Sequence, residues 1–354
     1  MRKSVSEIVK EIFNCMLDDE SRMIFQYMTA YFFDNRINHI WDMLKAVNEY
    51  DKLKPWPADR LRNLFSVRER YNGQPVILYG AGGNAPGIKA FLETLGVKAT
   101  AYCDSDPRKW NVFMDGLPIV SPDMLLEQHI DSLVIVSSPI YEDEISRRLI
   151  QMGVTRDRIF LPTFSESQYF GIPFITPIED EIYLDAGPYD GKTIIQFLKF
   201  CNNKYKKIYA MEPDPENYQK TCRYIEKLEL PNISLIEKGV WNCDAVLNFE
   251  GYITSGSRIT TDGSVRIPVT TIDKVVGDDN VTLVKMDIEG AELNALKGSE
   301  GTIKRCKPRL AICIYHRPED IFEIPICLLE LNPEYKFYIR QHAISCNETV
   351  IYAV

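Results

Sequence analysis

The chain has 354 residues, of which 45% are hydrophobic, 26% charged and 11% aromatic, as expected for a globular protein with more than one domain. Its formal net charge of −9 gives it little to gain from the counterion release that drives nucleic-acid binding. Apolar runs are too short for a spanning helix, and early acidic residues argue against a secretory signal. The nine cysteines form no CxxC pair, which favours reduced thiols, a cytoplasmic location and no structural zinc.

Residues 1–72 carry three apolar stripes with helical spacing. They run from Val5 to Leu17, from Met23 to Phe32 and from Ile37 to Val47. Apolar residues at i, i+3 and i+4 predict helices that each pack one face against a neighbour. We therefore expect an N-terminal helical segment.

From residue 73 the pattern changes to alternating strands and helices. Short apolar runs at 76–79, 99–103 and 133–137 are separated by segments with helical spacing. This alternation predicts a small parallel, Rossmann-like α/β domain over 73–165. The proline-containing segment 166–180 has little periodicity and is predicted to be a linker.

Residues 181–354 resume the same rhythm with more strands. Strands are expected at 182–185, 207–211, 233–237, 281–287, 309–315, 334–341 and 349–354, and helices at 191–201, 215–229, 290–305 and 319–331. A polar, β-prone insertion at 242–268 separates the third and fourth strands, and its residues 255–258 are expected to cover the site. Seven strands with interleaved helices predict one doubly wound, Rossmann-like α/β domain.

The first glycine-rich turn, Gly80-x-Gly82-x-x-Ala85, follows a predicted strand. Asp104 ends the next strand, 24 residues after Gly80, where a carboxylate could hold a ribose. The spacing fits the dinucleotide fingerprint, in which glycines let the backbone approach a phosphate. It fits a simple turn between strand and helix equally well.

The second glycine-rich turn starts at Asp185 and contains Gly187 and Gly191. The following strand ends in Glu212, 27 residues after Asp185, and a carboxylate there can accept hydrogen bonds from both ribose hydroxyls. Asp185 and Asp190 would repel a pyrophosphate, whereas Asp185 suits a cationic amino-acid tail. The turn therefore favours S-adenosyl-L-methionine over a dinucleotide.

Three segments, Tyr183–Thr193, Ile208–Asn217 and Leu283–Gly298, resemble the FkbM-type methyltransferases of the class I seven-stranded fold. The resemblance covers about 181–354 and implies methyl transfer from S-adenosyl-L-methionine to a hydroxyl of a sugar, glycoconjugate or polyhydroxylated metabolite. Pro188-Tyr189 departs from the family, where a small residue and Asn are more common. We expect these residues to contact the cofactor: Asp185, Gly187, Tyr189, Asp190, Gly191, Thr193, Glu212, Pro213, Val240 and Asp287.

Candidate catalytic residues follow the fourth and fifth strands of this domain. Asp287 and Glu289 come directly after the fourth, and His316 follows the fifth. Because ligands bind at the carboxyl ends of parallel strands, these groups are expected to meet. We interpret His316 as a neutral general base for the acceptor hydroxyl, with Asp287 to stabilise the imidazolium; His342 is the second histidine considered.

Several charged residues near these strand ends also have a structural interpretation. Glu289 and Glu292 could cap the following helix, and Asp273 is expected near a helix start. Lys285, two residues before Asp287, is expected to pair with it or to act in the site.

A resident metal is not expected, because Asp287 and Glu289 alone are a poor ligand set and the sequence shows no third ligand. The expected partner is a small-molecule or glycan acceptor, with a nucleotide-sugar and a homo-oligomer left open. Two competing hypotheses remain. One is a nicotinamide-dependent sugar-nucleotide oxidoreductase, which lacks a Tyr-x-x-x-Lys pair near 130–165; the other is a non-catalytic nucleotide-sugar-binding module.

Overall fold

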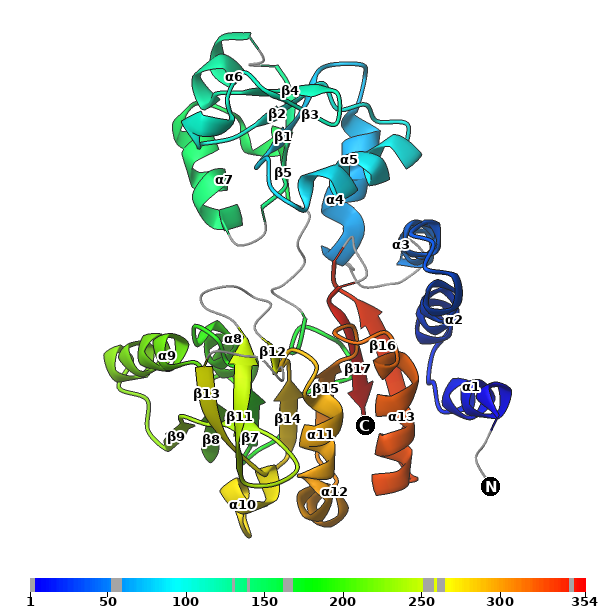
Figure 1. Ribbon diagram of the computed structural model, residues 1–354, viewed down its shortest axis with the longest axis vertical. Helices are drawn as coiled ribbons and strands as arrows, with labels where there is room; N and C mark the ends of the chain where they lie inside the picture. Colours follow the sequence, from blue (N-terminus) through cyan, green and yellow to red (C-terminus); the bar gives the residue numbers. More distant parts are fainter. Residues whose placement is uncertain are drawn as a thin grey trace. The chain divides into compact units, whose positions relative to one another are not determined.

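The computed structural model describes residues 4–51, 59–128, 131–138, 141–161, 168–250, 258–259, 265–343 and 347–354. They form two compact units, whose sheets and connecting helices are traced in Figure 1. Unit 1 comprises Met1–Phe33, Glu166–Gln341 and Glu348–Val354, and unit 2 comprises Asp34–Ser165 and His342–Asn347. The segment 1–72 is thus divided between the two units.

The sheet of unit 1 has seven strands in the order β16-β17-β15-β14-β7-β8-β9. The strands are β7 (Ile182–Ala186), β8 (Lys207–Met211), β9 (Ile233–Ile236), β14 (Leu283–Met286), β15 (Arg309–Cys313), β16 (Phe337–Gln341) and β17 (Thr349–Ala353). Only β17 runs antiparallel to its neighbours. The predicted doubly wound fold is confirmed. The chain order reverses between β7 and β14, and ligands of open α/β sheets bind at such a switch point.

Six helices connect or flank these strands: α8 (Lys192–Phe200), α9 (Pro215–Lys227), α10 (Ile272–Val276), α11 (Glu292–Lys297), α12 (Glu300–Cys306) and α13 (Asp320–Leu331). Asp273 lies in the first turn of α10, as predicted. The single helix predicted over 290–305 is wrong, because the chain forms α11 and α12 with a break after Gly298. A Cβ on Gly298 would lie 2.1 Å from the carbonyl oxygen of Trp241, so the backbone passes directly against that residue.

The predicted β-prone insertion contributes to a second, smaller sheet in the order β10-β13-β11-β12. Its strands are β10 (Gly239–Val240), β11 (Ala245–Glu250), β12 (Arg258–Ile259) and β13 (Val265–Thr270). Of the segment expected to cover the site, residues 255–257 lie outside the described part of the chain.

The short segment between α1 (Val5–Asn14) and α2 (Asp19–Asp34) pairs with the edge strand β16 of the seven-stranded sheet. Phe337 of β16 donates its N–H to Cys15 O at 2.9 Å and accepts from Leu17 N at 2.9 Å. The N–H of Ile339 donates to Ser21 Oγ, also at 2.9 Å. An uncovered edge strand would present unpaired backbone groups, so these contacts cover the edge of the sheet.

Unit 2 contains a six-stranded sheet in the order β3-β4-β2-β1-β5-β6, parallel apart from the β3–β4 pair. Its strands are β1 (Val76–Tyr79), β2 (Ala101–Cys103), β3 (Phe113–Met114), β4 (Leu117–Val120), β5 (Leu133–Val136) and β6 (Ile159–Phe160). Its helices are α3 (Asn38–Asp51), α4 (Asp59–Arg70), α5 (Ala85–Thr94), α6 (Pro122–Gln128) and α7 (Glu142–Gln151). The sheet contains the three strands predicted from the sequence.

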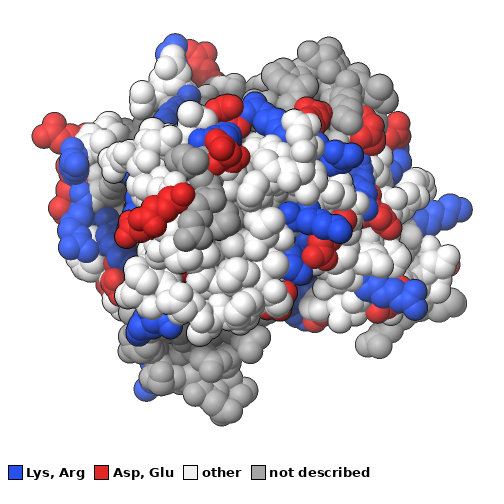
Figure 2. Space-filling model, turned by 90° about the horizontal axis from the view of Figure 1, so that it is seen from above, with Lys and Arg blue, Asp and Glu red and all other residues white. Residues whose placement is uncertain are grey.

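The surface carries charges of both signs. On the face drawn in Figure 2, Lys and Arg side chains are interspersed with Asp and Glu. Among the described residues, no helix combines the length and the apolar character needed to cross a membrane.

A buried ion network fixes α2 to β16 and gives a test of this packing. The guanidinium of Arg340 is 4% exposed, pairs with Asp18, and lies 3.1 Å from Glu20 Oε2. Removing one partner from a buried pair leaves uncompensated charge and typically costs about 3–5 kcal/mol. We expect Arg340→Ala to lower the free energy of unfolding by that amount, measured by urea denaturation.

The matched control is Lys304→Ala, which removes an exposed pair with Glu300 on α12. Exposed pairs contribute about 0–1 kcal/mol, so the urea midpoint should barely move. Equal effects of the two substitutions would contradict the packing described here.

Candidate active site

The glycine turn after β7 packs directly against the end of β14. Gly187 and Gly191 both have φ of +83°, a conformation that favours glycine. A Cβ on Gly187 would lie 2.0 Å from the carbonyl oxygen of Asp287, so only glycine allows this approach. Gly191 then starts α8.

A buried ion pair lies beneath this turn. Asp185 and Lys285 have side chains 0% and 1% exposed, and Lys285 Nζ lies 3.2 Å from Asp185 Oδ1. The ammonium also donates to Gly187 O at 2.5 Å, and the hydroxyl of Thr193 donates to Asp185. Burial lowers the pKa of Lys285, but the charges of Asp185 and Asp287 outweigh it and raise the pKa above its usual value.

Lys285 thus forms its ion pair with Asp185, whereas the sequence suggested Asp287. Both oxygens of Asp185 are occupied within the fold, by Lys285 and by Thr193. Asp185 is thus buried beneath the glycine turn, and its contact with a cofactor stays a prediction.

Glu212 ends β8 beside the same turn. It is 5% exposed, and its carboxylate accepts the N–H of Tyr189 at 3.1 Å and that of Asp214 at 3.0 Å. Burial raises the pKa of Glu212 to about 7, against the lowering effect of these two N–H donors. No ion pair within 4 Å is found for Glu212 among the described residues, although the charge of Lys285 also lowers its pKa.

The other expected cofactor residues lie in the turn after β7 and in β10 of the smaller sheet. Tyr189 has a φ of +53° and is 42% exposed, and Asp190 accepts the N–H of Lys192 at 3.2 Å. Val240 is buried in β10. A Cβ on Gly239 would lie 3.6 Å from Pro213 Cβ, so β10 runs beside the residue that follows Glu212.

Carboxylates surround His316 at the ends of β14 and β15. His316 Nε2 lies 3.4 Å from Asp287 Oδ1 and 3.5 Å from Glu289 Oε2, and Nδ1 lies 2.9 Å from Glu292 Oε1. The structure thus brings together the three residues predicted as catalytic. Glu292 also accepts the N–H of Ile288 at 2.8 Å, which agrees with the capping role considered for it.

The charges in this cluster change the protonation expected of His316. Burial lowers its pKa, but Glu292, Asp287 and Glu289 together raise it to about 9. These carboxylates favour the protonated imidazole, whereas the sequence led us to expect a neutral base. Burial raises the pKa of Glu289 to about 7, opposed by His316 and assisted by Asp287.

Three neighbours of this cluster were not identified from the sequence. Tyr169 donates its hydroxyl to Asp287 Oδ2 at 2.9 Å, although the sequence placed it in a linker. Glu348 accepts from Tyr315 at 3.3 Å, and burial, with the charge of Asp287, raises its pKa to about 7. Burial likewise raises the pKa of Asp320 to about 7, with the charge of Glu292 adding to the effect. No periodicity or motif marks Tyr169 or Glu348.

The structure also corrects the argument against a metal. Asp287, Glu292 and His316 each place one ligand atom within 4.8 Å of the others. Glu292 and His316 therefore offer ligand atoms beside Asp287 that the sequence argument did not consider.

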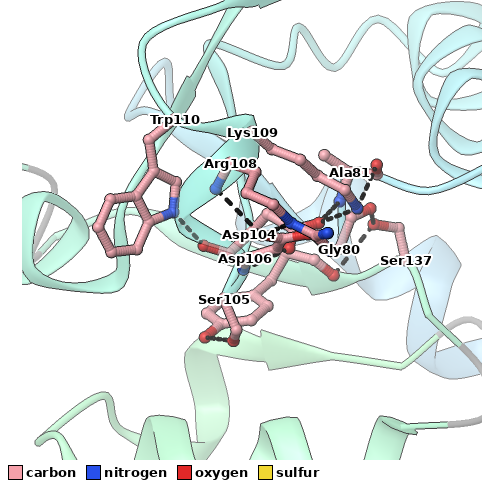
Figure 3. Close-up of polar contacts among 10 residues, drawn as sticks. Gly80, Ala81, Asp104, Ser105, Asp106, Arg108, Lys109, Trp110 and Ser137 are labelled. Atoms are coloured by element: carbon pink, nitrogen blue, oxygen red, sulfur yellow. Dashed lines mark hydrogen bonds and ion pairs between the residues drawn. The ribbon is translucent and has the colours of Figure 1, made fainter.

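The glycine turn of unit 2 has a different environment. Asp104 accepts the N–H of Ala81 and of Asp106, both at 2.8 Å, and pairs with Lys109 at 2.9 Å (Figure 3). Although burial raises the pKa of Asp104, these partners lower it below its usual value. The carboxylate expected to hold a ribose is thus already paired within unit 2.

Comparisons with known proteins agree with the geometry of unit 1. Residues 185–342 match the family described as methyltransferase FkbM domain, and residues 72–160 match C2185-like, N-terminal. Methyltransferase FkbM from Methylobacillus flagellatus KT is similar in structure, with a TM-score of 0.51 and 19% identity over 89% of this chain and 99% of that chain. A SAM dependent methyltransferase from Aquifex aeolicus gives 0.34 and 16% over 61% and 97%. The comparison with curated proteins finds no match.

The sheet order and the first of these structures define the seven-stranded methyltransferase fold. Residues 185–342 are thus similar to the methyltransferase FkbM domain.

The close contact between Gly187 and Asp287 can be tested by adding one methyl group at position 187. Gly187→Ala combines an unfavourable φ with a clash against backbone, so we expect unfolding free energy to fall by about 2 kcal/mol or more. Gly82→Ala is the control, because nothing lies within 4 Å of a Cβ at that position. Thermal or urea unfolding of both variants measures the difference, and a stable Gly187→Ala protein would refute the close approach.

Proposed function

We propose that unit 1 binds S-adenosyl-L-methionine and transfers its methyl group to a hydroxyl of a sugar, glycoconjugate or polyhydroxylated metabolite. The observation that carries this proposal is the environment of one glycine turn. A buried carboxylate without an ion pair, Glu212, lies on one side of it, and the carboxylates around His316 follow the adjacent strand end.

Glu212 is the proposed ribose ligand. Its oxygens lie beside the turn, and a carboxylate can accept hydrogen bonds from both hydroxyls of one ribose. Pro213 follows Glu212 directly, and Gly239, the neighbour of Val240 in β10, lies beside Pro213. Asp185 and Thr193 act in this proposal by holding the turn.

The proposed reaction is an in-line displacement. The acceptor hydroxyl loses its proton to Glu289, its oxygen bonds to the methyl carbon, and the carbon–sulfur electron pair returns to sulfur, which leaves S-adenosylhomocysteine. Glu289 is the proposed acceptor because its side chain is 33% exposed. Both nitrogens of His316 face carboxylate oxygens, so His316 balances charge and positions Asp287 and Glu289.

A polyhydroxylated acceptor fits this cluster chemically. Asp287 and Glu289 both lie near Nε2 of His316, and 26% and 33% of their side-chain surfaces are exposed. Ionised carboxylates only accept hydrogen bonds, and a vicinal diol offers two hydroxyl donors.

Cofactor binding should depend on Glu212 and on pH. Glu212→Ala should weaken S-adenosylhomocysteine binding by about 2–3 kcal/mol, the scale of hydrogen bonds to a charged group. The pKa of the free carboxyl is raised to about 7, and ribose hydroxyls favour its ionised form, so affinity should fall as pH drops below 7. Calorimetry at pH 6 in two buffers should show proton release on binding.

Two controls accompany this titration. Glu212→Gln should remove the proton release, and Asp104→Asn in unit 2 should leave binding unchanged because Asp104 is already paired. Tighter binding of NAD than of S-adenosylhomocysteine, or unaltered affinity in Glu212→Ala, would refute the cofactor assignment.

The chemical step should depend on Glu289. Glu289→Gln keeps the shape but removes the proton acceptor, so kcat should fall by roughly 10²–10⁴. The affinity for S-adenosylhomocysteine should stay the same, because the cofactor is held from β7 and β8. Methyl transfer from labelled S-adenosylmethionine to sugars and nucleotide-sugars measures the rate.

Each acceptor is paired with its analogue in which the methylated hydroxyl is removed, which should give no product. Turnover of Glu289→Gln at the normal rate would remove Glu289 from the mechanism. Methylation of amines or thiols in preference to every hydroxyl acceptor would refute the substrate class.

A further inference from the structure

Negative charge accumulates around a single imidazole at the ends of β14 and β15. Asp287, Glu289 and Glu292 lie within 3.5 Å of the ring nitrogens of His316. Three carboxylates that follow β14 thus face the two nitrogens of one imidazole.

Unpartnered polar atoms lie at the centre of this cluster. Among the described residues, Nδ1 and Nε2 of His316 and Oε2 of Glu292 are buried without a hydrogen bond. The two side chains are 7% and 0% exposed. Nδ1 does lie 2.9 Å from Glu292 Oε1, so Glu292 Oε2 is the atom of this pair that lacks a partner among the described residues. Buried groups of this kind are normally paired or bind an ion.

The spacing of the ligand atoms fits one metal ion. Oxygen and nitrogen ligands lie about 2.0–2.2 Å from a divalent transition metal, which puts them about 3–4.4 Å from one another. The candidate atoms of Asp287, Glu292 and His316 all lie within 4.8 Å of one another. An imidazole gives one nitrogen to an ion. With Nε2 of His316 as the ligand, its 3.4 Å separation from Asp287 Oδ1 lies within this range.

We propose that Asp287, Glu292 and His316 form a binding site for a divalent transition-metal cation, with Mn²⁺ as the representative ion. Two carboxylates with one imidazole suit Mn²⁺, whereas Mg²⁺ prefers oxygen ligands alone. The second ring nitrogen of His316 then donates to a neighbouring carboxylate, as metal-bound histidines usually do.

The proposed methyl transfer gives this ion a role, and this step rests on the proposed function. Asp287 is 26% exposed, so an acceptor hydroxyl can reach the ion from that side. A coordinated hydroxyl loses its proton more readily, and Glu289 lies beside His316 to receive it. The inferred site thereby narrows the substrate class to acceptors that coordinate a cation through oxygen.

The test is direct metal binding by the full chain, without cofactor or acceptor. EDTA-treated protein is titrated with MnCl₂, and free Mn²⁺ is followed by electron paramagnetic resonance. We expect one site. His316→Gln and Glu292→Gln should each weaken Mn²⁺ binding by roughly 100-fold or more. Even the loss of a residue that only hydrogen-bonds to a metal ligand typically lowers metal affinity by about 10–100-fold. Gln at 292 can still accept the N–H of Ile288, so the local fold is retained.

Asp320→Asn is the matched control, because it removes a nearby buried carboxylate outside the proposed ligand set. It should change the Mn²⁺ affinity less than threefold. The absence of a site in the wild type, or equal losses in Asp320→Asn and His316→Gln, would overturn the proposal. S-adenosylhomocysteine affinity, measured on the same samples, separates this result from the proposed function: intact cofactor binding without Mn²⁺ binding refutes only the metal site.

Discussion

The buried ion pair between Asp185 and Lys285 joins the two strand ends on which the site of unit 1 depends. Lys285 sits in β14, and its ammonium reaches across to Asp185 of β7 and to the carbonyl of Gly187. This contact fixes the glycine turn against Asp287 and leaves no space for a side chain at Gly187. A cofactor turn and an acidic strand end, about 100 residues apart in sequence, are therefore held at one fixed spacing.

Strands of unit 1 could be predicted from the sequence because most are short, apolar and bounded by turn residues. Lys207–Met211 matches its prediction from end to end, since both of its boundaries are polar. Features set by distant contacts could not be predicted. The break at Gly298 depends on the backbone of Trp241, and the covering of β16 depends on residues 15–21. Neither relation leaves a local pattern.

Some features of the candidate site could likewise be predicted from the sequence, and others could not. Asp287, Glu289 and His316 follow parallel strands, so their meeting could be predicted from topology alone. The raised pKa of His316 could not be predicted, because it depends on Glu292. The sequence suggests only a helix-capping role for Glu292. Tyr169 could not be found either, since it reaches Asp287 from a segment without periodicity. Chemistry that depends on a side chain's complete surroundings requires the structure.

The two glycine turns show why the surroundings of the acidic residue matter more than the fingerprint. In both units a carboxylate at the end of the second strand accepts a backbone N–H of the turn, Asp104 from Ala81 and Glu212 from Tyr189. Asp104 also has Lys109, and its pKa falls, so its charge is already stabilised. Glu212 has no such partner among the described residues, and burial raises its pKa. A ligand that donates hydrogen bonds gains most by meeting the unstabilised carboxylate, which favours cofactor binding at the turn of unit 1 over that of unit 2.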